Sequence, residues 1–131
     1  MDYKGVKNWY FGLETGIKLN NITHEYFNID YVVSDTIFRA KPTIILGRKV
    51  KFVKLKKELF SFGIIKEEFK RYSDIEKSLL DLIHIRKYNG EFDRAIIDEL
   101  IEWAEHASKK KLMNYAKYYS PFIRKIAGEI I

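Results

Sequence analysis

The spacing of apolar positions changes twice along the chain, from a helical period to an alternating one and back. Residues 9–19 (WYFGLETGIKL) carry apolar side chains at helical spacing, namely Tyr10, Leu13 and Ile17. Asn20 and Asn21 follow, and asparagine often ends helices because it tolerates the left-handed conformation. Gly12 and Gly16 lie one turn apart and would let another backbone approach closely. This segment therefore predicts a short buried helix.

A strand-like pattern covers the centre of the chain. β-Branched and aromatic residues dominate three short runs, at 29–34, 43–47 and 49–55. In the third run, lysines alternate with apolar residues until Phe52, after which the apolar positions change parity, so we expect a β-bulge there. Residues 59–65 fit either another strand or a turn. The pattern predicts a small mixed or antiparallel sheet.

From Ser73 onward the apolar period is helical again. Ser73 and Glu76 have the spacing of a capping box, in which each side chain accepts from an amide of the first turn. The helix that they open has one inward face, formed by Ile75, Leu79, Leu82, Ile83 and the stem of Arg86. Asn89 and Gly90 predict its end.

Further helices follow. One starts near Asp93, with an inward face of Ile97, Leu100, Ile101 and Ala104. Residues 109–111 are lysines near its end, where positive charge favours the helix dipole. Residues 112–119 continue or restart it, and Ser120 with Pro121 opens a last helix. The chain therefore predicts an α+β fold, with an N-terminal helix, the small sheet and a C-terminal group of three to four helices.

Length and composition indicate one domain over residues 1–131, because 47% of the residues are hydrophobic and 15% aromatic. Cysteine is absent, which excludes disulfides, thiolate nucleophiles and Cys-ligated zinc. We find no signal peptide and no long apolar run, so we expect a cytoplasmic protein that does not span the membrane. Abundant lysine and isoleucine without glutamine are a bias both of thermophile proteins and of AT-rich genomes.

We expect neither a metal site nor a cofactor. The three histidines, His24, His84 and His106, are far apart and have neither HExxH nor HxH spacing. The motifs GxSxG, GxxxxGKS/T and GxGxxG do not occur. The usual nucleophile and phosphate-binding signatures are therefore absent.

The charged residues of the stretch RYSDIEKSLLDLIH (71–84) have a structural explanation. Asp74 and Glu76 are favourable at the beginning of a helix, and Lys77 and Asp81 have the four-residue spacing of a helical ion pair. One helix carries them all, whereas an active site needs groups that converge from other segments. We therefore expect structural rather than catalytic roles.

An enzymatic alternative is a metal-dependent nuclease of the restriction type. Such a site needs an aspartate at a strand end and Glu-x-Lys on the next strand, because two carboxylates hold the metal and the lysine helps to position the attacking water. Asp30 or Asp35, followed by Glu68 and Lys70, supplies these residue types. Glu-x-Lys arises easily in a chain with 32% charged residues, so we favour a non-enzymatic protein.

The net charge is +6, and much of it lies in a basic cluster that consists of Arg48, Lys49, Lys51, Lys54, Lys56 and Lys57. These side chains could follow the phosphate backbone of a nucleic acid while Phe38 or Phe52 stacks on a base. Lysines also protect edge strands against aggregation. The sequence leaves both interpretations open.

Aromatic residues near the C-terminus indicate a third class of function, a helix-mediated interaction module. They are Tyr115, Tyr118, Tyr119 and Phe122. If exposed, they would suit an interface. Packing against the sheet is the competing interpretation.

Three segments occur together, in this order, in one known family: WYFGLETGIKLNNIT, IDYVVSDTIFR and YSDIEKSLLDLI. The first is similar to the helix-then-turn segment ALxLHGLT of the AbiEi-type antitoxins of type IV toxin–antitoxin (abortive-infection) systems. The second is similar to the strand that follows there. The third resembles the family's D-x-E-K/R-T-L-L-D helix, matched at Glu76, Lys77, Leu79, Leu80 and Asp81. The resemblance spans about residues 9–90.

The resemblance implies a non-enzymatic role in opposing a nucleotidyltransferase-type toxin, with no catalytic residue to carry over. Family members pair an N-terminal winged-helix DNA-binding domain, used in transcriptional regulation, with a C-terminal domain needed for antitoxicity. This chain resembles the C-terminal domain, since residues 1–8 cannot hold a winged helix. Residues 91–131 would be a helical extension of it.

Overall fold

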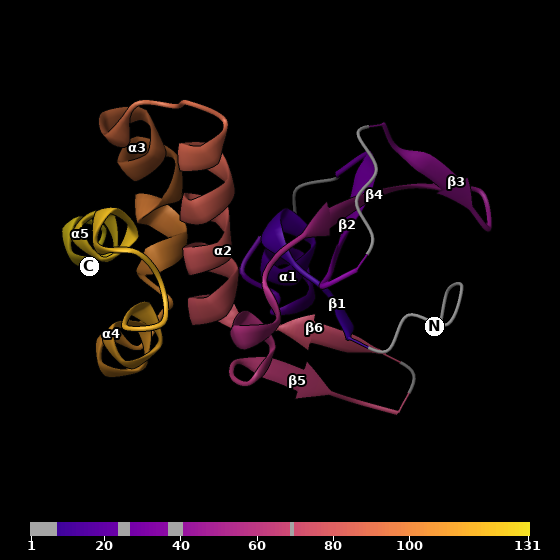
Figure 1. Ribbon diagram of the computed structural model, residues 1–131, viewed down its shortest axis with the longest axis horizontal. Helices are drawn as coiled ribbons and strands as arrows, with labels where there is room; N and C mark the ends of the chain where they lie inside the picture. The colour runs from indigo at the N-terminus through magenta and orange to yellow at the C-terminus, as the bar shows by residue number, and fades with distance from the viewer. Residues whose placement is uncertain (1–7, 24–26, 37–40, 69) are drawn as a thin grey trace.

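The computed structural model describes residues 8–23, 27–36, 41–68 and 70–131. Its elements in chain order are β1 (Trp9–Phe11), α1 (Leu13–Leu19), β2 (Ile29–Ser34), β3 (Thr43–Ile45), β4 (Arg48–Lys54), the 3-10 helix η2 (Lys57–Phe60), β5 (Ile64–Lys66), β6 (Arg71–Ser73), α2 (Ile75–Tyr88), α3 (Asp93–Ala104), α4 (Lys109–Ala116) and α5 (Pro121–Glu129). The sheet occupies one side of the molecule, α2–α5 gather on the other, and α1 lies between them (Figure 1). The predicted α+β fold is confirmed.

Within the described residues, six strands form one mixed sheet in the order β3-β4-β2-β1-β6-β5. The pairs β1–β2, β3–β4 and β5–β6 are antiparallel, whereas β1–β6 and β2–β4 are parallel. The hairpins β3–β4 and β5–β6 therefore make the two edges of the sheet. The N-terminal strand β1 lies inside it.

The helix predicted over residues 9–19 is wrong at its beginning. Trp9–Phe11 form β1, and α1 begins only at Leu13. The strand is favoured because β1 has a neighbour on each side and both of its faces are covered. Tyr10 enters the main core, while Trp9 enters a smaller cluster on the opposite face.

The bulge expected after Phe52 is wrong as well, since β4 pairs with β2 without interruption from Lys49 to Lys54. The apolar positions change parity because β4 buries side chains on both faces. One face carries a small cluster of Trp9, Val32, Val50 and Phe52. On the other face, Val53 packs against the main core.

Residues 59–65 are divided between two elements. Leu59 lies in η2, where it is buried, and Ile64 begins the edge strand β5. Gly63, between them, has a φ of +70° and turns the chain into the strand. The strand and the turn that the sequence offered as alternatives are thus both present.

The long helix α2 confirms the predicted span and end, but it has no single inward face in its first half, because residues 76–83 are all buried. Its inward residues Leu79, Leu82 and Ile83 are fully buried. Asn89 caps its C-terminus and Gly90 follows with a φ of +84°, as a helix-ending glycine does. Because α2 contacts α1, α3, α4 and α5, it is the central helix of the domain.

The later helices confirm the prediction in part. In α3, Ile96 is buried while Ile101 is 44% exposed, so one assigned inward position is wrong. Residues 109–111 begin α4 behind the cap Ser108, instead of ending α3. The helix dipole therefore disfavours these lysines, and Lys111 needs compensating charge from elsewhere.

Candidate functional site

The charged stretch at the beginning of α2 lies inside the protein. Asp74 and Glu76 are 6% and 4% exposed, and Lys77 and Asp81 are completely buried. The ion pair predicted between Lys77 and Asp81 is present, with 3.5 Å between Nζ and Oδ1. A buried ion pair depends strongly on further partners, because both charges have lost their water.

Asp81 receives those partners from two distant segments. Its Oδ2 accepts a hydrogen bond from the Tyr10 hydroxyl and its Oδ1 accepts one from the Tyr119 hydroxyl, each at 2.5 Å. Lys77 Nζ donates to the Tyr119 hydroxyl at 3.3 Å and lies 4.3 Å from the centre of the Phe62 ring. These contacts tie α2 to β1, to the segment after η2 and to the segment between α4 and α5.

The environment controls the protonation of this network. Burial lowers the pKa of Lys77, and the charge of Asp81 opposes that shift. Burial, reinforced by the charge of Asp81, raises the pKa of Tyr10 and of Tyr119 well above the usual range, so both phenols remain hydrogen-bond donors. Because Lys77 and Asp81 are completely buried, a substrate has no access to either of these charged groups.

Asp74 is the residue that caps α2. Its Oδ1 accepts from the backbone N–H of Lys77 at 2.9 Å, as an N-cap side chain does. Its Oδ2 accepts from the Tyr115 hydroxyl at 2.7 Å and pairs with Lys111 Nζ at 3.0 Å. Burial and this hydrogen bond raise the pKa of Tyr115 to about 12. The predicted cap at Ser73 is therefore wrong by one residue, because Ser73 still belongs to β6.

Glu76 caps a different helix from the one that contains it. Its Oε2 accepts from the backbone N–H of Ser108, the N-cap of α4, at 2.7 Å. Its Oε1 pairs with Lys111 Nζ at 3.5 Å. The glutamate thus makes the capping-box contact across two helices and offsets a lysine at a helix N-terminus.

The nuclease residues are not brought together. Asp30 lies in β2 and is bound to Arg48, whereas Glu68 lies exposed after β5 and Lys70 pairs with Glu67. Strands β1 and β6 separate β2 from β5, and a single strand spacing is about 4.8 Å. Asp35, at the other end of β2, accepts from Asn8. In the described part of the chain, no three His, Asp or Glu side chains could hold a metal ion together.

The histidines do not converge on a site. His84 is partly buried on α2, where burial lowers its pKa, and His106 is exposed after α3. His24 lies outside the described residues.

The basic cluster does not form the single face that the sequence indicated. Arg48 donates to Asp30 at 2.9 Å and to the Phe27 carbonyl at 3.3 Å, so it is a structural residue. Lys49 and Lys51 point to the face of the sheet opposite that of Val50, Phe52 and Lys54, because neighbouring strand residues alternate. Phe52 is 1% exposed and cannot stack on a base, and Phe38 lies outside the described residues.

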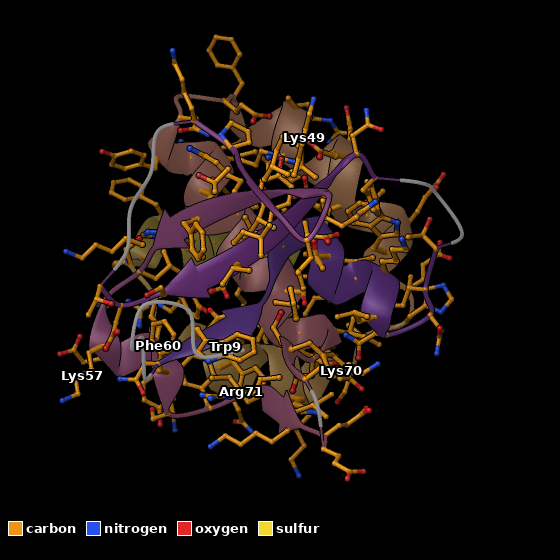
Figure 2. The ribbon with its side chains drawn as sticks, turned by 90° about the vertical axis from the view of Figure 1, so that its right-hand side faces the viewer. Trp9, Lys49, Lys57, Phe60, Lys70 and Arg71 are labelled. Carbon is orange, nitrogen blue, oxygen red and sulfur yellow. The ribbon has the colours of Figure 1, made fainter. Side chains whose placement is uncertain are left out.

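Four lysines of the cluster are exposed and lie along β4 and its continuation: Lys49, Lys54, Lys56 and Lys57. Figure 2 shows Lys49 and Lys57 well apart on the molecule. Seven residues of strand span about 20 Å, and Lys49 and Lys54 lie on opposite faces of the sheet, so the four lysines follow β4 in order without sharing one face. None of the four makes an ion pair within the described residues. We call these four residues the lysine row.

Edge protection does not explain most of the lysine row. Lys49 pairs with Ile29 of β2 on one side and with Ile44 of β3 on the other, so it lies on an internal part of β4. Lys56 and Lys57 lie outside every strand. Of the two edge strands, the neighbouring one, β3, has the residues Thr43, Ile44 and Ile45 and carries no charge.

The aromatic residues near the C-terminus mostly pack inward. Tyr119 is 5% exposed, and Tyr115 is partly buried against Phe62. Tyr118 is 43% exposed and stacks on the same ring, with centroids 4.7 Å apart. Phe122, at 69% exposure, is the most open of the four residues that the sequence singled out.

The sequence-based interpretation pairs no tyrosine with the buried acids, although Tyr10 and Tyr119 bind Asp81 and Tyr115 binds Asp74. No local pattern marks these pairs, because each tyrosine lies far along the chain from its acid. Lys111 did leave a signal. Ser108 before three lysines is an N-cap signal in the sequence, and a lysine in the first turn of a helix needs a nearby acid because the helix dipole disfavours it.

Comparison with protein-family models and with curated proteins finds no match to this chain. In the described residues, every helix is too short or too polar to cross a membrane.

Proposed function

We propose that this chain is a non-enzymatic domain that acts by binding, with the lysine row as its contact to nucleic acid. The proposal rests on the exposure of the lysine row. Four exposed cations without ion-pair partners among the described residues are spaced along β4 and the segment after it, with Lys49 on the opposite face of the sheet from Lys54, and edge protection accounts for only part of them. A phosphate backbone is an anion of matching chemistry.

The buried acids support a non-enzymatic interpretation. Asp74, Glu76 and Asp81 use their oxygens on tyrosine hydroxyls, lysines and helix amides of the domain. These are also residues of the helix that resembles the AbiEi-type antitoxins. The resemblance leads us to propose an antitoxin of that type, which counters a nucleotidyltransferase-type toxin, as the biological role.

Charge reversal of the lysine row tests the proposal. In the variant Lys49→Glu, Lys54→Glu, Lys56→Glu, Lys57→Glu, we expect affinity for a fluorescently labelled duplex to fall and its salt dependence to flatten. The slope of log K against log salt should decrease by up to about 3.6, since each neutralised phosphate of B-DNA contributes about 0.9. Fluorescence anisotropy at several salt concentrations measures both quantities.

A matched control places the same change of charge on the helical side, with Lys109→Glu, Lys110→Glu, Arg124→Glu and Lys125→Glu, all exposed residues. This control should retain the salt slope of the wild type. Equal slopes for wild type and the row variant would reject the lysine row as the contact. If both variants lose the same affinity and salt slope, the effect comes from net charge and the lysine row is rejected as the contact.

A further inference from the structure

The turn between β3 and β4 carries a leucine in an unfavourable place. Leu46 is 99% exposed and has a φ of +50°, and Gly47 after it has a φ of +79°. Two successive positive φ values are those of a type I′ hairpin turn, which favours asparagine, aspartate or glycine at its first central position. In Figure 1 this hairpin lies at the end of the molecule away from α2–α5.

The stability of the fold does not explain a leucine at position 46. The left-handed conformation costs a residue with a Cβ about 1–2 kcal/mol, and a side chain that stays in water regains nothing by burial. Ile44, next to the turn on β3, is 71% exposed and adds a second apolar side chain. Strain at an exposed position indicates function when no packing explains it.

Cations surround this apolar tip. Ile44 is directly opposite Lys49, so the two side chains share one face of the hairpin. Arg48 is opposite Ile45 on the other face, where its charge is paired with Asp30. Lys41 is exposed on the approach to β3. The hairpin therefore presents an apolar tip between positive charges, and this charge selects an anionic partner.

We propose that the β3–β4 hairpin enters the minor groove of duplex nucleic acid and that Leu46 inserts between two base pairs. Apolar wedges of this kind partly unstack a base step while flanking cations bind the phosphates beside it. Lys49 on the hairpin and Lys41 before β3 supply the cations beside the tip, and a groove has a phosphate backbone along each wall for them to contact. The inference rests on the proposed nucleic-acid contact and assigns its substrate class, a deformable duplex.

The variant Leu46→Asn tests the wedge. Asparagine tolerates a positive φ, so the hairpin should keep its shape while the apolar tip disappears. The probe is a duplex that contains 2-aminopurine, whose fluorescence increases when the base unstacks. We expect the wild type to raise this fluorescence on saturation, and Leu46→Asn to lose the increase while its binding retains the salt dependence of the wild type.

The control is Phe92→Asn, which removes another strongly exposed apolar side chain, 84% exposed, at the cap position of α3, where asparagine is favourable. It should raise the fluorescence as the wild type does. An equal increase with Leu46→Asn would overturn the wedge and leave the nucleic-acid contact standing.

Two other results separate the inference from the proposed function. If the wild type does not bind the duplex at all, both the proposed contact and the wedge fail. If it binds phosphatidylserine vesicles instead, and Leu46→Asn abolishes that binding, the tip is a membrane contact and the wedge is overturned.

Discussion

At the scale of single residues, the main feature is a charge pair that has been taken out of water. Lys77 and Asp81 are each fully buried, and Asp81 keeps its charge compensated by Lys77 and by two phenol donors. Each partner is needed, because an unpaired charge in the interior costs several kcal/mol. The same residue types in a cleft would indicate catalysis, but here they connect secondary-structure elements.

Asp81→Asn should therefore destabilise the fold strongly. The variant leaves Lys77 without a carboxylate and weakens two hydrogen bonds, so we expect a loss of about 3–5 kcal/mol in the free energy of unfolding, or no folded state. Urea denaturation followed by circular dichroism measures it. Asp98→Asn on α3, which removes an exposed partner of Arg94, should cost less than about 1 kcal/mol. A variant at Asp81 as stable as that control would contradict the structural role.

At the scale of elements, α2 and α1 meet at a place where only glycine fits. A Cβ on Gly16 would lie 2.5 Å from Ser73 Oγ and closer still to Ser78 Oγ. These two hydroxyls are 2.6 Å apart and hydrogen-bond to each other, so neither can move without losing that contact. The pairing of glycines one turn apart in the sequence thus indicated a real helix contact at Gly16.

Gly16→Ala and Gly128→Ala should consequently have opposite signs. Overpacking at Gly16 should destabilise the domain by about 1–3 kcal/mol. Gly128 lies in α5 with nothing within 4 Å of an added Cβ, so alanine there should stabilise by about 0.5–1 kcal/mol through helix propensity. Thermal and urea denaturation of both variants give the two values. Stabilisation by Gly16→Ala would refute the tight contact.

At the scale of the whole molecule, the buried acids and the exposed hairpin lie in different parts of the fold. The acids at the beginning of α2 are directed to α4 and to the segment before α5, whereas the β3–β4 hairpin lies at the end of the molecule away from α2–α5 (Figure 1). Under the proposed function, binding through this hairpin would leave α3, α4 and α5 free to contact a second partner.

The proposed antitoxin role predicts rescue in cells. The proposal expects the neighbouring gene in the protein's own genome to be toxic, so co-expression of this chain with that gene should restore growth, and Asp81→Asn should rescue less because it destabilises the fold. The row variant then shows whether nucleic-acid binding is needed for rescue. Colony counts on inducing plates measure the effect. Persistent toxicity with the wild-type chain folded and soluble would contradict the antitoxin role.

Much of the fold follows from local pattern. The span of α2 and its Asn89-Gly90 end were both predictable, because a long amphipathic period and a terminal glycine act within a few residues. The failures lie where a tertiary neighbour overrides the pattern. Trp9–Phe11 form a strand because β2 and β6 pair with them. The apolar positions of β4 change parity, which indicated a bulge, because both of its faces are covered.

The sequence by itself determined the α+β class, the span of α2 and the position of the basic cluster along the chain, since these depend on periodicity and composition. Only the tertiary structure decided which charges are buried and which face solvent. Asp81 depends on Tyr10 and Tyr119, 71 and 38 residues away along the chain. Contacts at such separations follow from how the elements pack, and no local pattern encodes them.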